Sequence, residues 1–151
     1  MMASLFMSRA FRLEEQVQSK LQQIERLRSL ASKVTSNTAN EPVSHTRDVT
    51  EMQDAVIRIM EEEEILKTRI KMLMDVKEQI RDVIEQVDDV TLQLILEKRY
   101  LLYESIKEIA ADLGYTYRWT EKKHKKALQE ADRIIDERYE LDIWTGDHKS
   151  S

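Results

Sequence analysis

The chain has 151 residues, of which 35% are charged, with two glycines, one proline, no cysteine and a net charge of −5. So few turn-forming residues indicate an all-α protein, because sheets and long loops need more glycine and proline. The lack of cysteine excludes disulfides and thiolate metal sites. The apolar opening is too short for a signal peptide, and no later stretch is apolar for the ~20 residues of a membrane span. We therefore expect a soluble, cytoplasmic protein without contact to a membrane.

The first predicted helix covers residues 5–34. Apolar residues recur along one side of it, at Leu13, Val17, Leu21, Ile24, Leu27, Ala31 and Val34. The segment that follows, residues 35–48, contains the only proline and almost no apolar residue, so we expect an exposed, mobile linker. Asp48 at its end is a candidate cap for the next helix.

The second predicted helix carries a coiled-coil seam with a period of 3.5 residues. Its positions alternate steps of three and four along Val49, Met52, Val56, Ile59, Glu63, Leu66, Ile70, Leu73, Lys77, Ile80, Ile84 and Val87. The two long helices are expected to pair antiparallel, as a helical hairpin or coiled coil, and the width of the apolar face favours a bundle or dimer over a single hairpin. The residues that we expect to carry oligomerisation are Val56, Ile59, Leu66, Ile70, Leu73 and Ile80.

A shorter helix is predicted over residues 91–103, after the boundary at Asp88 and Asp89. Tyr100 continues the apolar spacing of Leu92 and Leu96, which places it in the core.

Residues 105–113 are predicted to form a short helix that ends in a tight turn. The hydroxyl of Ser105 can cap the first amide groups while Glu108 reaches back, which is a capping box. Gly114 stands where the helix must stop, and Thr116 can cap a second helix. An apolar stripe gives the first helix a packing face: Ile106, Ile109, Ala110 and Leu113. Two helices joined in this way have the layout of a helix-turn-helix motif.

The second helix of this pair is basic and is predicted to end at about Ala127 and Leu128. Between Tyr115 and Leu128, five basic residues and one acidic residue give a local charge of +4, whereas the whole chain carries −5. A lysine cluster can be a solvated helix face. Its position after a capped turn favours a DNA-binding surface, because attraction to phosphates acts locally. Beyond residue 136 the apolar spacing fades, and we expect a C-terminal tail.

The segment from Leu96 to Leu128, LEKRYLLYESIKEIAADLGYTYRWTEKKHKKAL, resembles the DNA-binding region four of bacterial sigma factors. The shared pattern is an arginine-containing helix, Glu-Ile-Ala, two residues, Leu-Gly, a capping hydroxyl and a helix ending in Ala-Leu. Upstream, FRLEEQVQSKLQQIERLRSLASKV and the long helix that ends near Val87 are similar to small phage proteins of Gram-positive bacteria, classed as sigma-region-four-like or late-gene transcription regulators. The resemblance covers Phe11 to Ile135.

This resemblance implies which residues would contact double-stranded DNA. The matching positions for base and backbone contacts are Thr116, Tyr117, Arg118, Glu121 and Lys122, and Arg99 matches a phosphate contact. The basic patch adds Lys125.

The chain departs from the sigma pattern on the inner face of the second helix. Thr120 and Lys123 stand there in place of apolar residues, and the bulky apolar residue is displaced to Trp119. A slightly rotated helix would turn Trp119 inward, so we predict Trp119 in the core and Tyr117 on the surface.

Nothing in the sequence indicates an enzyme. It contains no glycine-rich phosphate loop, nucleophile elbow or paired-histidine metal motif. The acidic run 61–64 points around most of a helix turn and is expected to be a solvated face. His124 is expected to be a polar helix residue, and we expect no metal and no cofactor.

The sequence thus predicts an oligomerisation region over residues 1–88, a DNA-binding region over 89–136 and a tail over 137–151. The function it favours is a sequence-specific transcription regulator of phage or prophage type. Such a regulator would act as a homo-oligomer in the cytoplasm of a bacterial host cell, with RNA polymerase as a further candidate partner. Two alternatives stay open: a small terminase-like DNA-packaging subunit, and a protein-interaction module whose helix-turn-helix does not bind DNA.

Overall fold

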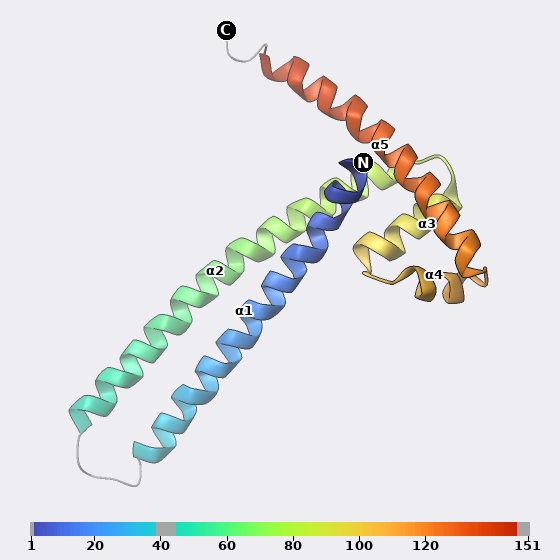
Figure 1. The fold of residues 1–151 in the computed structure, drawn as a ribbon. Helices are drawn as coiled ribbons and strands as arrows, with labels where there is room; N and C mark the ends of the chain where they lie inside the picture. Colours follow the sequence, from blue (N-terminus) through green and yellow to red (C-terminus); the bar gives the residue numbers. More distant parts are fainter. Residues whose placement is uncertain (1, 39–44, 148–151) are drawn as a thin grey trace. The chain divides into compact units, whose positions relative to one another are not determined.

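The computed structural model describes residues 2–38 and 45–147, and within them every regular element is a helix (Figure 1). The elements are α1 (Met2–Thr38), α2 (His45–Glu85), α3 (Val90–Leu96), the π-helix η1 (Glu97–Leu101), α4 (Ile106–Leu113) and α5 (Tyr117–Asp147). The prediction of an all-α protein is therefore confirmed.

The long helices extend further than their apolar spacing indicated. α1 continues to Thr38 and α2 already begins at His45, so the expected linker 35–48 is helical at both ends, and Asp48 lies inside α2 instead of capping it. The remainder of that linker, residues 39–44, lies outside the described residues. Likewise α5 runs on to Asp147, through the expected tail. Extending an existing helix by one residue costs little compared with starting one, so polar residues of modest propensity are added to it.

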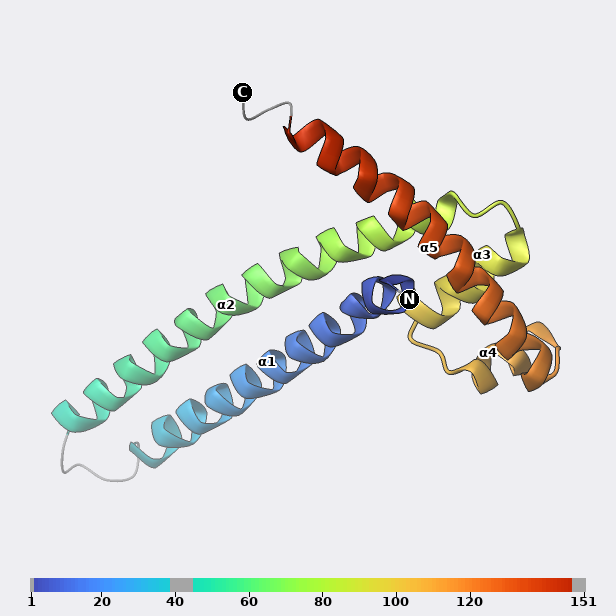
Figure 2. The ribbon, with the colours of Figure 1, turned by 45° about the horizontal axis from the view of Figure 1, so that its top comes forward.

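The chain forms two compact units. We call Leu13–Leu73 the hairpin unit, and Met1–Arg12 together with Met74–Ser151 the head unit. In the hairpin unit, α1 and α2 lie side by side and antiparallel, as both Figure 1 and Figure 2 show. Val17, Ile24 and Leu73 are buried in this unit.

Ion pairs and hydrogen bonds fix the antiparallel register of the hairpin unit. Lys20 Nζ lies 2.6 Å from Glu62 Oε2, and Arg28 pairs with Glu63. Arg69 donates a hydrogen bond of 3.0 Å to Gln16 Oε1. The hydrogen bond from Lys20 lowers the pKa of Glu62 below its usual value. Lys20 and Glu62 are partly buried, whereas the more exposed pair of Arg28 and Glu63 contributes less than about 1 kcal/mol, so it sets register more than stability.

The coiled-coil seam of α2 is divided between covered and uncovered positions. Leu73 is buried in the hairpin unit and Ile80 in the head unit. Ile59 and Leu66 are half-buried, whereas Val56 and Ile70 are exposed. Within one chain, then, only part of the predicted seam is covered by another helix.

The head unit has an apolar core to which α3, α4 and α5 all contribute, with α3 and α4 packed on α5. Its largest fully buried side chains are Met7, Ile80, Val83, Ile84, Val87, Leu92, Ile95, Leu96, Thr120, Ile109 and Ile135. The start of α1 joins this unit through the amide of Ala3, which donates to Asp132 Oδ1 at 2.5 Å. At the start of α3, Asp89 accepts hydrogen bonds from the amides of Thr91 and Leu92.

The helix predicted over residues 91–103 ends earlier and changes type. α3 passes into the π-helix η1 at Glu97, and Tyr103 has a φ of 61°, which reverses the chain toward α4. A left-handed backbone disfavours any residue with a side chain, so packing must hold it in place. The ring of Tyr103 packs edge-on against Phe11 at 5.7 Å between centroids. Tyr100 is buried, as its spacing predicted.

Candidate nucleic-acid interface

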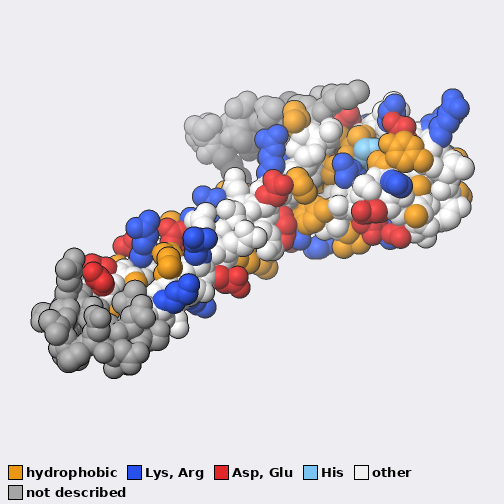
Figure 3. All heavy atoms as spheres, turned by 60° about the horizontal axis from the view of Figure 1, so that its bottom comes forward, with side chains coloured by type: hydrophobic (Ala, Val, Ile, Leu, Met, Phe, Trp, Pro, Cys, Tyr) orange, Lys and Arg blue, Asp and Glu red, His pale blue; other side chains and the backbone are white. Residues whose placement is uncertain are grey.

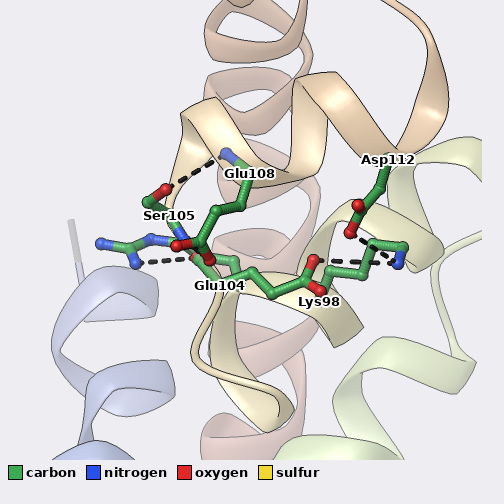
Figure 4. Close-up of polar contacts among 6 residues, drawn as sticks. Lys98, Glu104, Ser105, Glu108 and Asp112 are labelled. Carbon is green, nitrogen blue, oxygen red and sulfur yellow. Dashed lines mark hydrogen bonds and ion pairs between the residues drawn. The ribbon is translucent and has the colours of Figure 1, made fainter.

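The start of α4 is fixed by the predicted capping box, which Figure 4 shows. The amide of Glu108 donates to Ser105 Oγ at 3.1 Å, and the amide of Ser105 donates to Glu108 Oε2 at 3.2 Å. These bonds satisfy two donors that a helix start would otherwise leave free. The capping box is confirmed.

A charged cluster beside this cap ties α4 to η1. Lys98 Nζ lies 3.4 Å from Asp112 Oδ2 and 3.7 Å from Glu104 Oε2 (Figure 4). Burial raises the pKa of Glu104, and the neighbouring Asp112 raises it further through a hydrogen bond and its charge. Lys98 forms ion pairs with both carboxylates and thereby links η1 to α4.

The turn between α4 and α5 consists of Gly114, Tyr115 and Thr116. Gly114 has a φ of +75°, the left-handed conformation expected at a helix end. The amide of Tyr115 donates to the carbonyl of Ala110 at 3.0 Å. Thr116 Oγ1 accepts a hydrogen bond of 3.1 Å from the amide of Trp119, so it caps α5 as predicted.

Replacing Gly114 with alanine should lower the free energy of unfolding of the head unit by about 1–2 kcal/mol. A Cβ at this position would meet no atom within 4 Å, so the cost arises only from the left-handed backbone. Urea titration followed by tryptophan fluorescence measures the loss. Gly114→Asn is the matched control, because asparagine tolerates this conformation better; equal losses in both variants would mean that the backbone is not the cause.

Three of the predicted DNA contacts form a basic stripe along the outer face of α5. Arg118, Lys122 and Lys125 are exposed, and steps of four and three residues place them on one side of the helix. Tyr117 and Thr116 are also exposed, at the beginning of the helix. The buried side of the helix is formed by Thr120, Ala127 and Ala131. We call Arg118, Lys122 and Lys125 the basic stripe.

The two remaining predicted DNA contacts, Glu121 and Arg99, are less exposed than the residues of the basic stripe. Glu121 is half-buried on α5. Arg99 is half-buried on η1, and its guanidinium donates a hydrogen bond of 3.0 Å to the carbonyl of Glu104. Arg99 therefore helps to shape the chain before α4, and its phosphate contact stays a prediction.

The prediction that Trp119 enters the core is wrong. Thr120 occupies the core position and is fully buried, and its hydroxyl donates to the carbonyl of Thr116 at 2.9 Å. Threonine is tolerated because this bond satisfies its polar atom within the helix. The helix is therefore not rotated. Tyr117, with 54% of its surface exposed, lies outside as predicted.

Trp119 instead belongs to a surface stack that the sequence analysis missed. Its ring stacks on Tyr115 at 3.9 Å between centroids and 23° between planes. Lys123 Nζ lies 5.6 Å from the Trp119 centroid, within reach of a cation–π interaction. The spacing of four residues between Trp119 and Lys123 was a usable signal, because side chains four apart share a helix face, whereas Tyr115 lies in the turn before α5 and its place in the stack could not be read from a helical period.

His124 connects α5 to η1. Its Nε2 lies 2.8 Å from the hydroxyl of Tyr100, and the two rings stack at 5.7 Å. Burial lowers the pKa of His124 below 6.5, with a further contribution from the charge of Arg99. Burial also raises the pKa of Tyr100. The pair therefore holds α5 against η1 within the head unit.

The contribution of His124 to stability should decrease as the pH falls below about 6.5. The unfolded chain binds a proton at this histidine before the folded chain does, because the folded pKa is the lower one. Urea unfolding at pH 7.5 and pH 5.5 should show a smaller pH dependence for His124→Gln than for the original protein. A pH dependence that His124→Gln leaves unchanged would contradict the lowered pKa.

Two further properties concern the described residues alone. They contain no group of three or more histidine, cysteine, aspartate or glutamate side chains placed to hold a metal ion. Their helices lack the combination of length and apolar character that crossing a bilayer demands. Comparison with known proteins gives no family: no protein-family model, no curated protein and no solved structure matches the chain.

Proposed function

We propose that the protein binds double-stranded DNA through the outer face of α5. The observation that carries the proposal is the basic stripe, which is exposed on a helix that follows α4 after a turn of three residues. In helix-turn-helix proteins the second helix enters the major groove with its first residues on base edges. Arg118 and Lys122 lie in the first two turns of α5 and are suited to this position.

Local charge supports the proposal despite the acidic chain. Acidic side chains are scarce on this part of α5, where Glu121 is the only one between Tyr115 and Leu128. Phosphate attraction is screened over roughly 10 Å at 0.1 M salt, so the distant acidic residues affect it little. Together with the resemblance to sigma region four, this favours a sequence-specific transcription regulator of phage or prophage type, with RNA polymerase as a candidate partner.

The aromatic stack favours one alternative, a protein-interaction module. Tyr115 exposes half of its surface, and Trp119 is half-buried beside it. Exposed aromatic residues are enriched at protein–protein interfaces. This surface could receive a protein partner in place of DNA, or beside it.

The proposed function is tested by selecting bound fragments from a library of the encoding genome at two salt concentrations. Enrichment of an intergenic fragment that weakens at the higher salt would support the regulator. Enrichment of a packaging site would favour the terminase-like alternative instead. The absence of enrichment at both salt concentrations would overturn DNA binding and leave the interaction module.

A further inference from the structure

One face of α2 in the hairpin unit carries apolar side chains that remain exposed among the described residues. Met60 exposes 60% of its surface, Val56 46% and Ile70 37%, whereas Leu73 exposes 7%. These exposed residues lie on the same helix as the covered seam positions. Figure 3 shows one face of the molecule, where apolar side chains reach the surface between charged ones; the exposed residues of α2 are identified by their exposed fractions.

Some of the exposed apolar residues of α2 share a regular spacing with two charged residues, whereas Ile57, Ile65 and Met72, which are also exposed, lie off it. Val56, Met60, Glu63, Lys67 and Ile70 are separated by steps of four, three, four and three, and we call them the α2 stripe. A period of 3.5 residues keeps such a stripe facing one partner helix along its length. The stripe therefore has the pattern of a helix–helix contact, while α1 occupies the neighbouring side of α2.

The α2 stripe matches a second α2 stripe that runs in the opposite direction. In an antiparallel pair centred on position 65, Met60 comes opposite Ile70 of a second copy, and Glu63 comes opposite Lys67. Each contact then occurs twice, as two-fold symmetry requires. The sequence continues the spacing with Met74, which comes opposite Val56.

We propose that the α2 stripe is the contact between two copies of this chain, paired antiparallel. Charge decides the orientation. A parallel pair in register would place Glu63 against Glu63 and Lys67 against Lys67, and like charges at such positions oppose association. In the antiparallel pair each Glu63 lies opposite Lys67 of the other copy, and apolar side chains lie opposite apolar side chains.

The existing ion pairs are compatible with this contact. Glu63 already pairs with Arg28 on α1, and Lys67 lies 3.2 Å from Glu64. Glu63 and Lys67 are therefore each beside an opposite charge before the second copy arrives, which limits the cost of partly removing them from water. Two hairpin units joined in this way would give four helices in one bundle.

Cysteine cross-linking tests the proposal, because the chain has no cysteine of its own. The double variant Met60→Cys/Ile70→Cys should form covalent dimers under mild oxidation. Each single variant should not, since position 60 lies roughly 15 Å along the axis from its own copy, beyond the reach of a disulfide. Glu61→Cys/Thr68→Cys is the matched control, with two exposed positions off the stripe.

The results separate the possible arrangements. Covalent dimers in the double variant alone, together with the mass of a dimer for the original protein, would support the antiparallel pair. Cross-linking of either single variant would indicate a parallel pair and overturn the proposal. A monomer mass at tens of micromolar would also overturn it.

A charge exchange provides a second test that does not depend on cysteine. Glu63→Lys and Lys67→Glu should each weaken the dimer, and the combination should restore it at least in part. If the combined variant is as weak as the single ones, Glu63 and Lys67 do not meet. These experiments use the protein without DNA, so they can fail while the proposed DNA binding holds, and the reverse.

Discussion

Replacing Arg118, Lys122 and Lys125 together with alanine is expected to weaken DNA binding on the order of a hundredfold. Each lost contact contributes about 1 kcal/mol, and tenfold in affinity corresponds to about 1.4 kcal/mol. The dependence of log K on log salt should become shallower by about 0.9 for each phosphate contact removed. Fluorescence anisotropy on a selected fragment at several salt concentrations measures both quantities.

The control for this variant removes charge elsewhere. Arg26→Ala/Lys33→Ala takes two positive charges from α1, which belongs to the hairpin unit at these positions, and should leave affinity nearly unchanged. A loss of similar size in the control would mean that net charge governs binding, in which case the basic stripe is not the site. Arg118→Ala alone should also relax the preference for one sequence, because arginine is the residue suited to reading guanine.

Replacing Ile109 with alanine is expected to lower the free energy of unfolding of the head unit by about 3 kcal/mol. Ile109 is fully buried on α4, and a truncation of this kind costs roughly 2–5 kcal/mol through lost burial and the remaining cavity. DNA binding should decrease together with stability, since α4 supports α5. Urea unfolding followed by fluorescence measures the change, because Trp119 lies at the start of α5.

Ile106→Ala is the matched variant for this experiment. It removes the same atoms from the same helix at a half-buried position, so we expect less than half of the loss. Equal losses in the two variants would show that helix propensity, and not burial at Ile109, determines the result.

The local features of the candidate site could be predicted because each depends on residues close together in the chain. The capping box of Ser105 and Glu108, the helix end at Gly114 and the cap at Thr116 involve neighbours no more than four positions apart. Helix propensity and capping depend on residues within about one helical turn, so the local sequence was sufficient to predict these features. The position of the basic stripe on one side of α5 could likewise be predicted from the helical period.

Features that depend on distant residues were decided by tertiary packing. The position of α5 against α3 and α4 buried Thr120 and left Trp119 to stack on Tyr115. The pairing of His124 with Tyr100 required two elements to meet. The seam of α2 showed the same limit: its period predicted a partner helix, but only the packed hairpin shows that Leu73 is covered and Val56 is not. The spacing of apolar residues shows that one face of a helix is apolar. Whether that face is buried depends on which other element packs against it.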